Sequence, residues 1–258
     1  MRSLLFNVAY WIISILYTLM AAFSALAPGR KATGWIIRRY VRRMVQAMRL
    51  LAGIRLEVRG KERLPEEAFI IAAKHQSWGD GFCVYSQFDD LAFVTGNHLE
   101  RFPLLGTVLQ KLGAIVVDNC GGVTARKALA ASAAQAKADG RRILIYPEGH
   151  LAKVGEHFRY RSGVWHMYKD FDMPVVPQAT NLGLFWPQQA WRKNPGTAII
   201  EFLEPIPTGL GKAEFLARLE EAIEGRTAEL VAEATGRPVE RAVLVEAPDE
   251  AERRQRAA

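Results

Sequence analysis

Cysteine is scarce in this chain, with only Cys83 and Cys120 among 258 residues. Two cysteines cannot build a disulfide framework and show no metal-ligand spacing, so we expect free thiols in a reducing compartment. Three catalytic patterns are also missing, namely G-x-S-x-G, G-x-x-x-x-G-K-[ST] and H-E-x-x-H. Their absence removes support for an α/β-hydrolase elbow, a P-loop and a helical zinc protease. The histidines other than His75 have no paired spacing that suggests a metal, so we expect none.

Acidic residues are fewer than basic ones, with 27 Asp and Glu against 34 Lys and Arg, a net charge of +7. A basic excess in an otherwise ordinary composition indicates an anionic partner, which could be nucleic acid, a membrane surface or an acidic carrier protein. No nucleic-acid recognition motif and no basic surface with interleaved aromatic residues is present, so we expect no nucleic-acid partner. An anionic membrane surface and an acidic carrier protein stay open.

Residues 3–27 contain no charged side chain. As a helix they would span about 37 Å, more than the roughly 30 Å of a hydrocarbon core. Three interpretations compete for this run: a cleaved signal peptide, a soluble core helix and a retained membrane anchor. The anchor is favoured because the apolar run is longer than a signal peptide needs and Pro28 follows the small-residue stretch.

Residues 29–53 predict a basic amphipathic helix, with apolar residues at helical spacing and five arginines between them (Arg38, Arg39, Arg42, Arg43 and Arg49). The helix could pack on the domain with a solvated basic face, or lie on anionic headgroups, which we favour because it directly follows the apolar run. The positive charge after that run predicts that the rest of the chain lies on the cytoplasmic face of the inner membrane.

From residue 54 onward, short apolar runs alternate with helical segments. The pattern predicts an α/β fold with a mixed, largely buried sheet flanked by helices and preceded by a membrane-associated two-helix segment. The expected strands are 54–60, 68–75, 91–96, 113–119, 141–147, 173–181 and 197–205, and the expected helices are 79–88, 98–112, 124–138, 161–171 and 212–234. We therefore expect a membrane-anchoring segment at 1–53, an α/β domain at 54–240 and a disordered tail at 241–258.

A histidine and an aspartate follow the second expected strand, in the stretch KHQSWGD that runs from Lys74 to Asp80. A neutral imidazole has a reference pKa of about 6.5 and can accept a proton from a hydroxyl, and a carboxylate on its other nitrogen would orient it. The stretch YPEGH follows another expected strand, so both polar clusters could meet at the same edge of one sheet. His75 and Asp80 are therefore candidate catalytic residues.

Several blocks in order now resemble the glycerolipid acyltransferase family. They are KHQSWGD, FVTGNHLERFPLLGTVLQKLGAIVVDN, YPEGH and MPVVPQATN, and the apolar and basic first 53 residues look like that family's membrane-docking helices. The resemblance covers nearly all of residues 1–230. It implies that residues 54–240 are an acyltransferase domain that needs no cofactor. This domain would transfer an acyl chain from acyl carrier protein or coenzyme A to a lysolipid.

The resemblance also implies roles for individual residues. His75 would be the general base on the acceptor hydroxyl and Asp80 its orienting partner, while Glu148 and Gly149 would shape the acceptor site. His150 is a further candidate for the acceptor site because it lies beside Glu148. Trp78 could line an acyl channel or pack under the loop.

The chain departs from the family where a phosphate would be held. Gly96 or Asn97 replaces a usual lysine and Asn119 a usual arginine, and Glu-Gly-Thr-Arg becomes Glu-Gly-His-Leu at 148–151. A buried phosphate needs charge-assisted donors, so these losses favour an acceptor without one, such as a lyso-ornithine-type aminolipid.

Two alternatives stay open. Lys153, Arg159 or Arg161 could take over the phosphate, in which case lysophosphatidic acid would be the acceptor. The chain could also be an inactive membrane-anchored lipid-binding protein, although such a protein has no need of His75 and Asp80. The expected acceptor-binding residues are accordingly Asn97, Glu148, Gly149, His150, Arg159 and Arg161.

Overall fold

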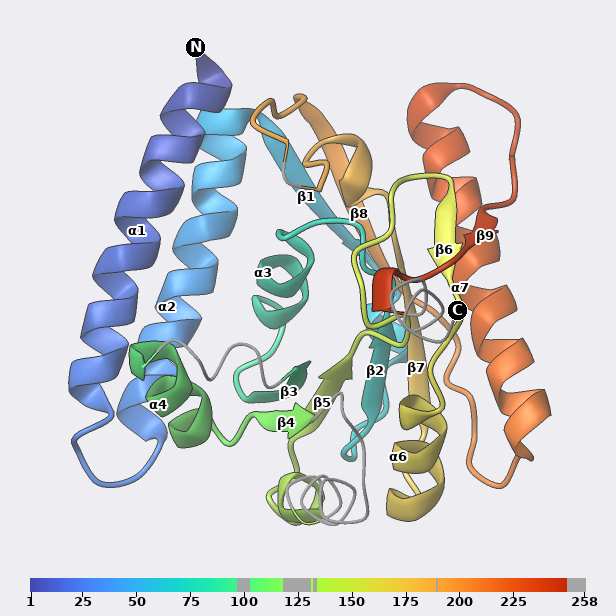
Figure 1. The fold of residues 1–258 in the computed structure, drawn as a ribbon, viewed down its shortest axis with the longest axis horizontal. Coiled ribbons are helices and arrows are strands. Elements are labelled where there is room, and N and C mark those ends of the chain that lie inside the picture. The colour runs from blue at the N-terminus through green and yellow to red at the C-terminus, as the bar shows by residue number, and fades with distance from the viewer. Residues whose placement is uncertain (97–102, 118–130, 132–133, 189, 250–258) are drawn as a thin grey trace, which may run out of the picture.

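The computed structural model describes residues 1–96, 103–117, 131, 134–188 and 190–249, and shows a helical hairpin beside a sheet that carries further helices on both faces (Figure 1). The hairpin consists of α1 (Arg2–Ser24) and α2 (Lys31–Ala47), which ends in a turn of π-helix at Met48–Ala52. The uncharged and the basic segments thus form the two helices expected for them.

The sheet has seven strands in the order β1-β8-β7-β2-β5-β3-β4. The strands are β1 (Ile54–Arg59), β2 (Ile70–Ala73), β3 (Leu91–Gly96), β4 (Ile115–Val117), β5 (Arg142–Ile145), β7 (Val175–Thr180) and β8 (Gly196–Phe202). All neighbouring pairs are parallel except β7 and β8, which are antiparallel. The expectation of a mixed α/β sheet is confirmed.

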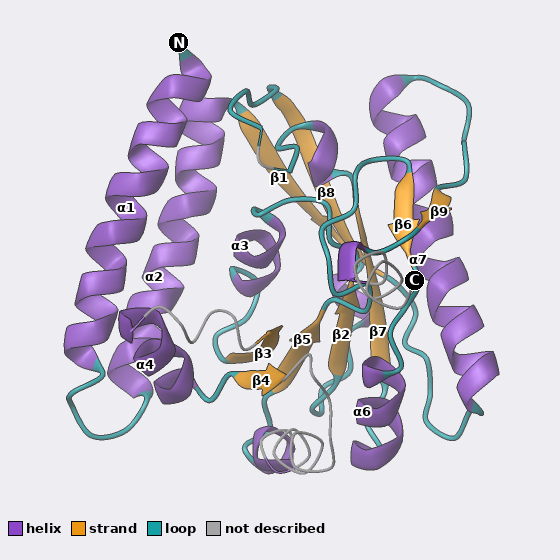
Figure 2. Cartoon of the chain, viewed as in Figure 1, coloured by secondary structure: helices purple, strands orange, loops and turns teal. Residues whose placement is uncertain are grey.

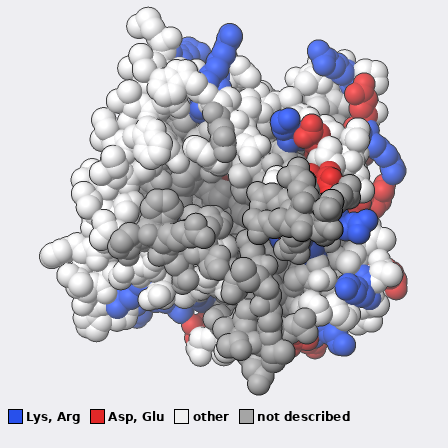
Figure 3. Space-filling view, in the orientation of Figure 1, with Lys and Arg blue, Asp and Glu red and all other residues white. Residues whose placement is uncertain are grey.

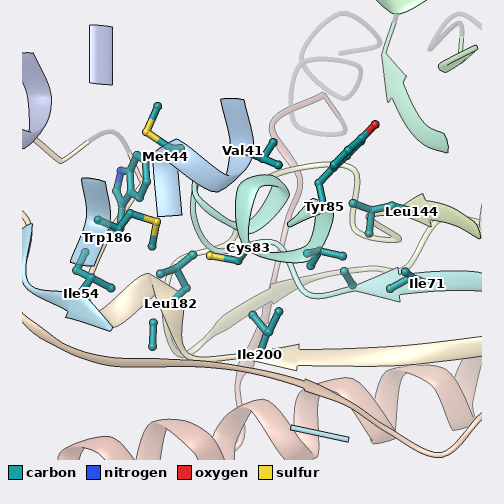
Figure 4. Packing of buried hydrophobic residues seen from close by; sticks show 14 of the residues in the cluster. Val41, Met44, Ile54, Ile71, Cys83, Tyr85, Leu144, Leu182, Trp186 and Ile200 are labelled. Atoms are coloured by element: carbon teal, nitrogen blue, oxygen red, sulfur yellow. The ribbon is translucent and has the colours of Figure 1, made fainter. Parts of the chain in front are cut away.

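Alternate residues of a strand point to opposite sides of the sheet, and helices cover both sides here, so both faces of the sheet are buried. In β2, Ile71 and Ala73 pack with residues of α1, α2 and α3 (Asp80–Tyr85), the cluster drawn in Figure 4. Ile70 and Ala72 pack with residues of α6 (Gly163–Phe171) and α7 (Lys212–Thr235) on the other face. All four side chains of β2 are fully buried, which explains why this strand is a continuous apolar run.

The helices α1 and α2 are antiparallel and touch along their length. Ser14 Oγ lies 2.8 Å from Tyr40 Oη, and Ser24 Oγ lies 3.0 Å from Thr33 Oγ1. Within the described part of the chain, α1 is the one helix that is long and apolar enough to cross a membrane. Its outer side is apolar and exposed, at Leu4, Leu5, Val8, Trp11, Ile12, Ile15, Leu16, Leu19, Met20 and Phe23. The α1 side of the molecule shows few charged side chains, whereas many gather over α7 (Figure 3).

The expectation of a disordered tail from residue 241 is wrong for its first nine residues. Val243–Val245 form β9, which pairs in parallel with β6 (Glu156–Phe158) next to α7 (Figure 2). Both strands have only three residues, too few for an alternation of apolar and polar positions to be read from the sequence. Residues 250–258 lie outside the described part of the chain.

The other expected elements are found where the chain is described. The helices expected at 79–88, 161–171 and 212–234 are α3, α6 and α7, and the end of the one expected at 98–112 is α4 (Pro103–Leu112). Residues 134–138 are helical, as expected for the end of 124–138. Asn97, Asn119 and Cys120 lie outside the described residues.

Candidate active site

The candidate site lies where β2 and β5 end. These strands are parallel neighbours with Ala72 opposite Ile145, so the residues that follow them meet at one edge of the sheet. The rings of His75 and Tyr146 stack there, with centroids 3.9 Å apart and planes inclined by 17°. The shared edge anticipated for KHQSWGD and YPEGH is therefore observed.

His75 and Asp80 are joined across the intervening turn. His75 Nδ1 lies 3.1 Å from Asp80 Oδ2, and the same oxygen accepts the backbone N–H groups of Gln76 and Ser77, each at 2.7 Å. The Asp80 side chain is buried, whereas the His75 side chain is 19% exposed. Three contacts thus hold the carboxylate, and a proton on Nδ1 facing Asp80 leaves Nε2 as the ring nitrogen that can accept another proton.

A glycine allows this turn to pack closely. A Cβ on Gly79 would lie 2.7 Å from the ring of Trp186, so a larger residue would push the turn away from that ring. Trp186 in turn contacts α1, with its ring centroid 5.0 Å from Phe6 and 5.8 Å from Tyr10. The turn that carries His75 and Asp80 is therefore packed indirectly against the apolar helix.

Trp78, the residue before Gly79, also lies near that helix. It is 42% exposed and lines a hollow of about 270 Å³ between the turn and α1. The hollow is mostly aromatic, with Tyr10, Trp11, Trp186 and Trp191 around Trp78. Trp78 is therefore not packed under its loop, and its apolar surroundings are compatible with an acyl chain.

Glu148 lies beneath the site and is inaccessible to solvent. Its carboxylate is 3.1 Å from Lys74 Nζ, and its Oε2 accepts the backbone N–H of Phe158 at 2.9 Å. Lys74 Nζ also donates to Glu224 of α7, at 2.9 and 3.0 Å. Burial raises the pKa of Glu148 to about 7 against the opposing charge of Lys74, and the nearby Glu224 adds to the rise. Glu148 is thus placed to support the site from below rather than to touch an acceptor.

Gly149 and His150 lie nearer the surface with Arg161. Gly149 has a φ of +71°, a conformation that favours glycine, and a Cβ on it would lie 2.6 Å from Arg161 Nε and displace that side chain. Arg161 Nη2 lies 2.8 Å from His150 Nε2. Arg159 lies along the same edge and lines a hollow with Arg161. Of the expected acceptor-binding residues, Asn97 lies outside the described part of the chain.

Four residues of this region were missed by the sequence analysis: Lys74, Tyr160, Glu224 and Asp249. Tyr160 Oη donates to Glu224 Oε1 at 2.8 Å, and Asp249 contacts Arg161. Lys74 carried a signal, because it is a charged residue at the end of an apolar run. Nothing local marks Glu224 or Asp249, which reach the site from the far end of the chain.

Cys83 is poorly suited to act as a thiol nucleophile, and Cys120 lies outside the described part of the chain. The Cys83 side chain is buried, and burial, with a smaller contribution from Asp80, raises the pKa of its thiol. Among the described residues, no three His, Cys, Asp or Glu side chains are grouped to hold a metal ion.

Fold and site together define an α/β protein with a buried-carboxylate–imidazole pair near a hairpin of one apolar and one basic helix. Comparison with known proteins is consistent with this class. The family profile described as Acyltransferase matches residues 55–181. The 1-acyl-sn-glycerol-3-phosphate acyltransferase of Pseudomonas aeruginosa is 33% identical over 180 residues, 70% of each chain.

Two further matches extend this result. The enzyme of the same name from Saccharomyces cerevisiae is 27% identical over 165 residues, 62% of this chain and 54% of the yeast protein. The crystal structure of the 1-acyl-sn-glycerophosphate acyltransferase PlsC from Thermotoga maritima superposes with a TM-score of 0.71 at 20% identity, over 90% of this chain and 98% of that one. The chain belongs to the glycerolipid acyltransferase family and is an acyltransferase, which confirms the resemblance seen in its sequence.

Proposed function

We propose that this acyltransferase moves a fatty acyl chain from an acyl thioester to the free hydroxyl of a membrane lysolipid, with His75 as general base. The observation that carries the proposal is the Asp80 carboxylate on His75 Nδ1, which leaves Nε2 for the substrate. The thioester would be carried by acyl carrier protein or coenzyme A. Either donor is anionic and fits the basic composition of the chain.

The proposed reaction needs no nucleophile from the protein. His75 Nε2 accepts the proton of the acceptor hydroxyl while the oxygen of that hydroxyl bonds to the thioester carbonyl carbon. The imidazolium that forms is stabilised by Asp80. When the C–S bond breaks, the imidazolium returns the proton to the departing thiolate, so the products are the ester and the free thiol.

Lysophosphatidic acid is the acceptor that we favour. The curated relatives from Pseudomonas and yeast are named for 1-acyl-sn-glycerol-3-phosphate. The side chain of Arg161 packs on Gly149, so a guanidinium is present although Leu151 replaces the family's usual arginine in this loop. Arg161 would therefore supply the missing charge-assisted donors for a phosphate.

A lyso-ornithine-type aminolipid is the second candidate acceptor. It is favoured by the same replacements at His150 and Leu151, which reduce the positive charge of this loop relative to the usual family pattern. Its headgroup carries a carboxylate in place of a phosphate, and one guanidinium can bind a carboxylate through two hydrogen bonds.

We further propose that residues 1–53 dock the enzyme on the cytoplasmic face of the inner membrane, with residues 54–240 as the catalytic domain. A spanning α1 would carry the antiparallel α2 with it, and Arg39, Arg42 and Arg43 of α2 are exposed. Exposed arginines in hydrocarbon are costly, whereas an amphipathic pair lying in the interface buries apolar side chains and leaves the charges at the headgroups.

The test is acyl transfer by the purified full-length protein in detergent, with acyl carrier protein or coenzyme A thioesters as donors. Lysophosphatidic acid and lyso-ornithine lipid are the two acceptors, and His75→Ala is the control. Turnover of lysophosphatidic acid that His75→Ala abolishes supports the proposal, and turnover of the aminolipid alone selects the second candidate. Lipid binding without turnover of either acceptor would instead favour a binding protein that retains the fold.

A further inference from the structure

A carboxylate from the C-terminal part of the chain reaches the Glu-Gly loop. Arg161 Nη2 donates to Asp249 Oδ1 at 2.7 Å, and His150 Nε2 lies 2.7 Å from the same oxygen. The three side chains are partly exposed, between 29% and 37%. Partial burial raises the pKa of Asp249, but the hydrogen bond from His150 and the charge of Arg161 outweigh it and hold that pKa below its usual value. Asp249 is therefore present as an anion.

This ion pair is connected to the catalytic turn through the backbone. Arg161 N–H donates to Pro147 O at 2.8 Å, and Ala152 N–H donates to the carbonyl of His75, also at 2.8 Å. The loop that carries His150 is thus hydrogen-bonded at Pro147 to Arg161 and at Ala152 to His75, the residue that follows β2. An anion bound by Arg161 would be held at the same edge of the sheet as the catalytic imidazole.

The surroundings of Asp249 favour anions. Arg159, Arg161, Ser162 and Lys212 line, with Asp249, a hollow of about 480 Å³. Three of these lining residues are cationic and one is anionic, so the hollow keeps an excess of positive charge when Asp249 is in place. Ser162 directly precedes α6, whose amino end adds positive potential to the edge of the hollow.

We propose that Arg161 and His150 bind the anionic headgroup of the acceptor, and that Asp249 occupies this site until the acceptor displaces it. The headgroup could present a phosphate monoester or a carboxylate, since both offer oxygens to the same guanidinium. Partly exposed ion pairs are weak, so a substrate anion can replace Asp249. The inference rests on the proposed function, because it assumes that the acceptor's reactive hydroxyl lies at His75.

A short tether keeps Asp249 near this site. Val243 N–H donates to Gly155 O at 2.9 Å at the start of the β6–β9 pair, and Arg241 donates to Glu221 of α7. Four residues after β9, the chain presents Asp249 to Arg161. A tethered carboxylate competes at a high effective concentration without any strong contact of its own.

The experiment measures equilibrium binding of detergent-dispersed lysophosphatidic acid to the full-length protein without acyl donor. If Asp249 occupies the site about 70–90% of the time, only about 10–30% of the molecules can bind the lipid at any moment. Asp249→Asn frees the site and should lower the apparent Kd about threefold to tenfold. Arg161→Gln should raise the Kd about tenfold or more. Asp249→Glu, which keeps the carboxylate, should bind nearly as the unchanged protein does.

Two controls separate the Asp249 carboxylate from negative charge elsewhere in the same segment. Glu240→Gln removes an exposed carboxylate just before β9 and should leave the Kd unchanged; equal tightening in this variant would overturn the proposal. An uncharged monoacylglycerol should bind Asp249→Asn and the unchanged protein alike. A parallel series with lyso-ornithine lipid shows whether the phosphate or the carboxylate is the anion that competes.

Failure of the inference is distinguishable from failure of the proposed function. Equal Kd values of Asp249→Asn and the unchanged protein for both anionic lysolipids would overturn the inference, whether or not the protein turns these lipids over. Tighter binding by Asp249→Asn, with no turnover in any variant, would support the anion site and contradict the proposed reaction.

Discussion

The imidazole of His75 lies flat against the ring of Tyr146, with centroids 3.9 Å apart, although the two residues are 71 positions apart in the chain (146 − 75). Asp80 holds the edge of the imidazole and Tyr146 covers its face, so the ring is fixed in two directions. Such a ring pays little reorientation cost when it accepts a proton.

The first prediction concerns this stack. Tyr146→Phe keeps the ring and removes a hydroxyl that is buried without a hydrogen-bond partner. We expect turnover within about twofold of the unchanged protein and equal or greater stability, because no satisfied polar group is lost. Tyr146→Leu should lower kcat about tenfold through poorer positioning of His75. Steady-state kinetics and thermal melting of both variants test this, and equal kcat values for Phe and Leu would contradict it.

The second prediction concerns Asp80. Asp80→Asn can keep an oxygen facing His75 Nδ1 and the N–H groups of Gln76 and Ser77, but it removes the negative charge that stabilises the imidazolium, so kcat should fall on the order of 100-fold to 10,000-fold. The double variant His75→Ala with Asp80→Asn should be no slower than His75→Ala alone, since the two residues act as one unit. Multiplicative losses in the double variant would show that Asp80 acts independently of the histidine.

The third prediction is a dependence of stability on pH. Glu148 has a folded-state pKa of about 7, raised by burial from an ordinary value of 4.5. The folded protein therefore binds more protons than the unfolded chain between these values, and its stability should fall as the pH rises through about 7. Glu148→Gln should flatten this part of the curve. Melting temperatures from pH 4.5 to 8 test it, and parallel curves for both proteins would refute the assignment.

The fourth prediction concerns Lys74, whose ammonium lies between the carboxylates of Glu148 and Glu224. Lys74→Met leaves two buried carboxylates without their cation and should lower the free energy of unfolding by about 3–5 kcal/mol. Lys153→Met is the matched control, because Lys153 is exposed and its ammonium makes only a loose surface pair with Glu156, at 4.0 Å. Urea denaturation measures both, and similar small losses would mean that the buried cluster is protonated enough to tolerate the loss.

The fifth prediction concerns the docking of α1. If α1 lies in the interface, cysteines introduced at Arg2 and Leu26, near its two ends, should be labelled from the same side of a sealed vesicle. The background would replace Cys83 by Ala and Cys120 by Ser. Labelling of the two positions from opposite sides would mean that α1 spans the bilayer.

Much of the fold could be predicted from local patterns. The four buried residues of β2 form a continuous apolar run, and the uncharged stretch from residue 3 that forms nearly all of α1 is visible from composition alone. His75 and Asp80 were found because both lie within one turn after a strand. Parallel pairing of β2 and β5 then placed Tyr146 and Glu148 beside them, as the pattern of strand ends predicted.

The remaining features depend on contacts between distant parts of the chain. Glu224 is separated from Lys74 by 150 positions, and no local pattern on α7 distinguishes it from the other glutamates of that helix. The residues Val243–Val245 form a strand only because β6 offers its edge, and two of the three are exposed. Sequence periodicity reports burial on one element and cannot report which partner a short segment will find.

The antiparallel pairing of β7 and β8 keeps the segment that connects them beside α1. Because β8 runs against β7, residues 181–188 and 190–195 lie at the edge of the sheet that carries the candidate site, where Trp186 lies between α1 and the turn at Gly79. Asn7 of α1 donates to the carbonyl of Trp191 at 2.8 Å and ties this segment to the helix a second time. With α1 on a lipid surface, as proposed above, these contacts would fix the distance between the His75 imidazole and that surface. The proposed lysolipid acceptor would then have to rise out of the lipid layer by that distance to present its hydroxyl.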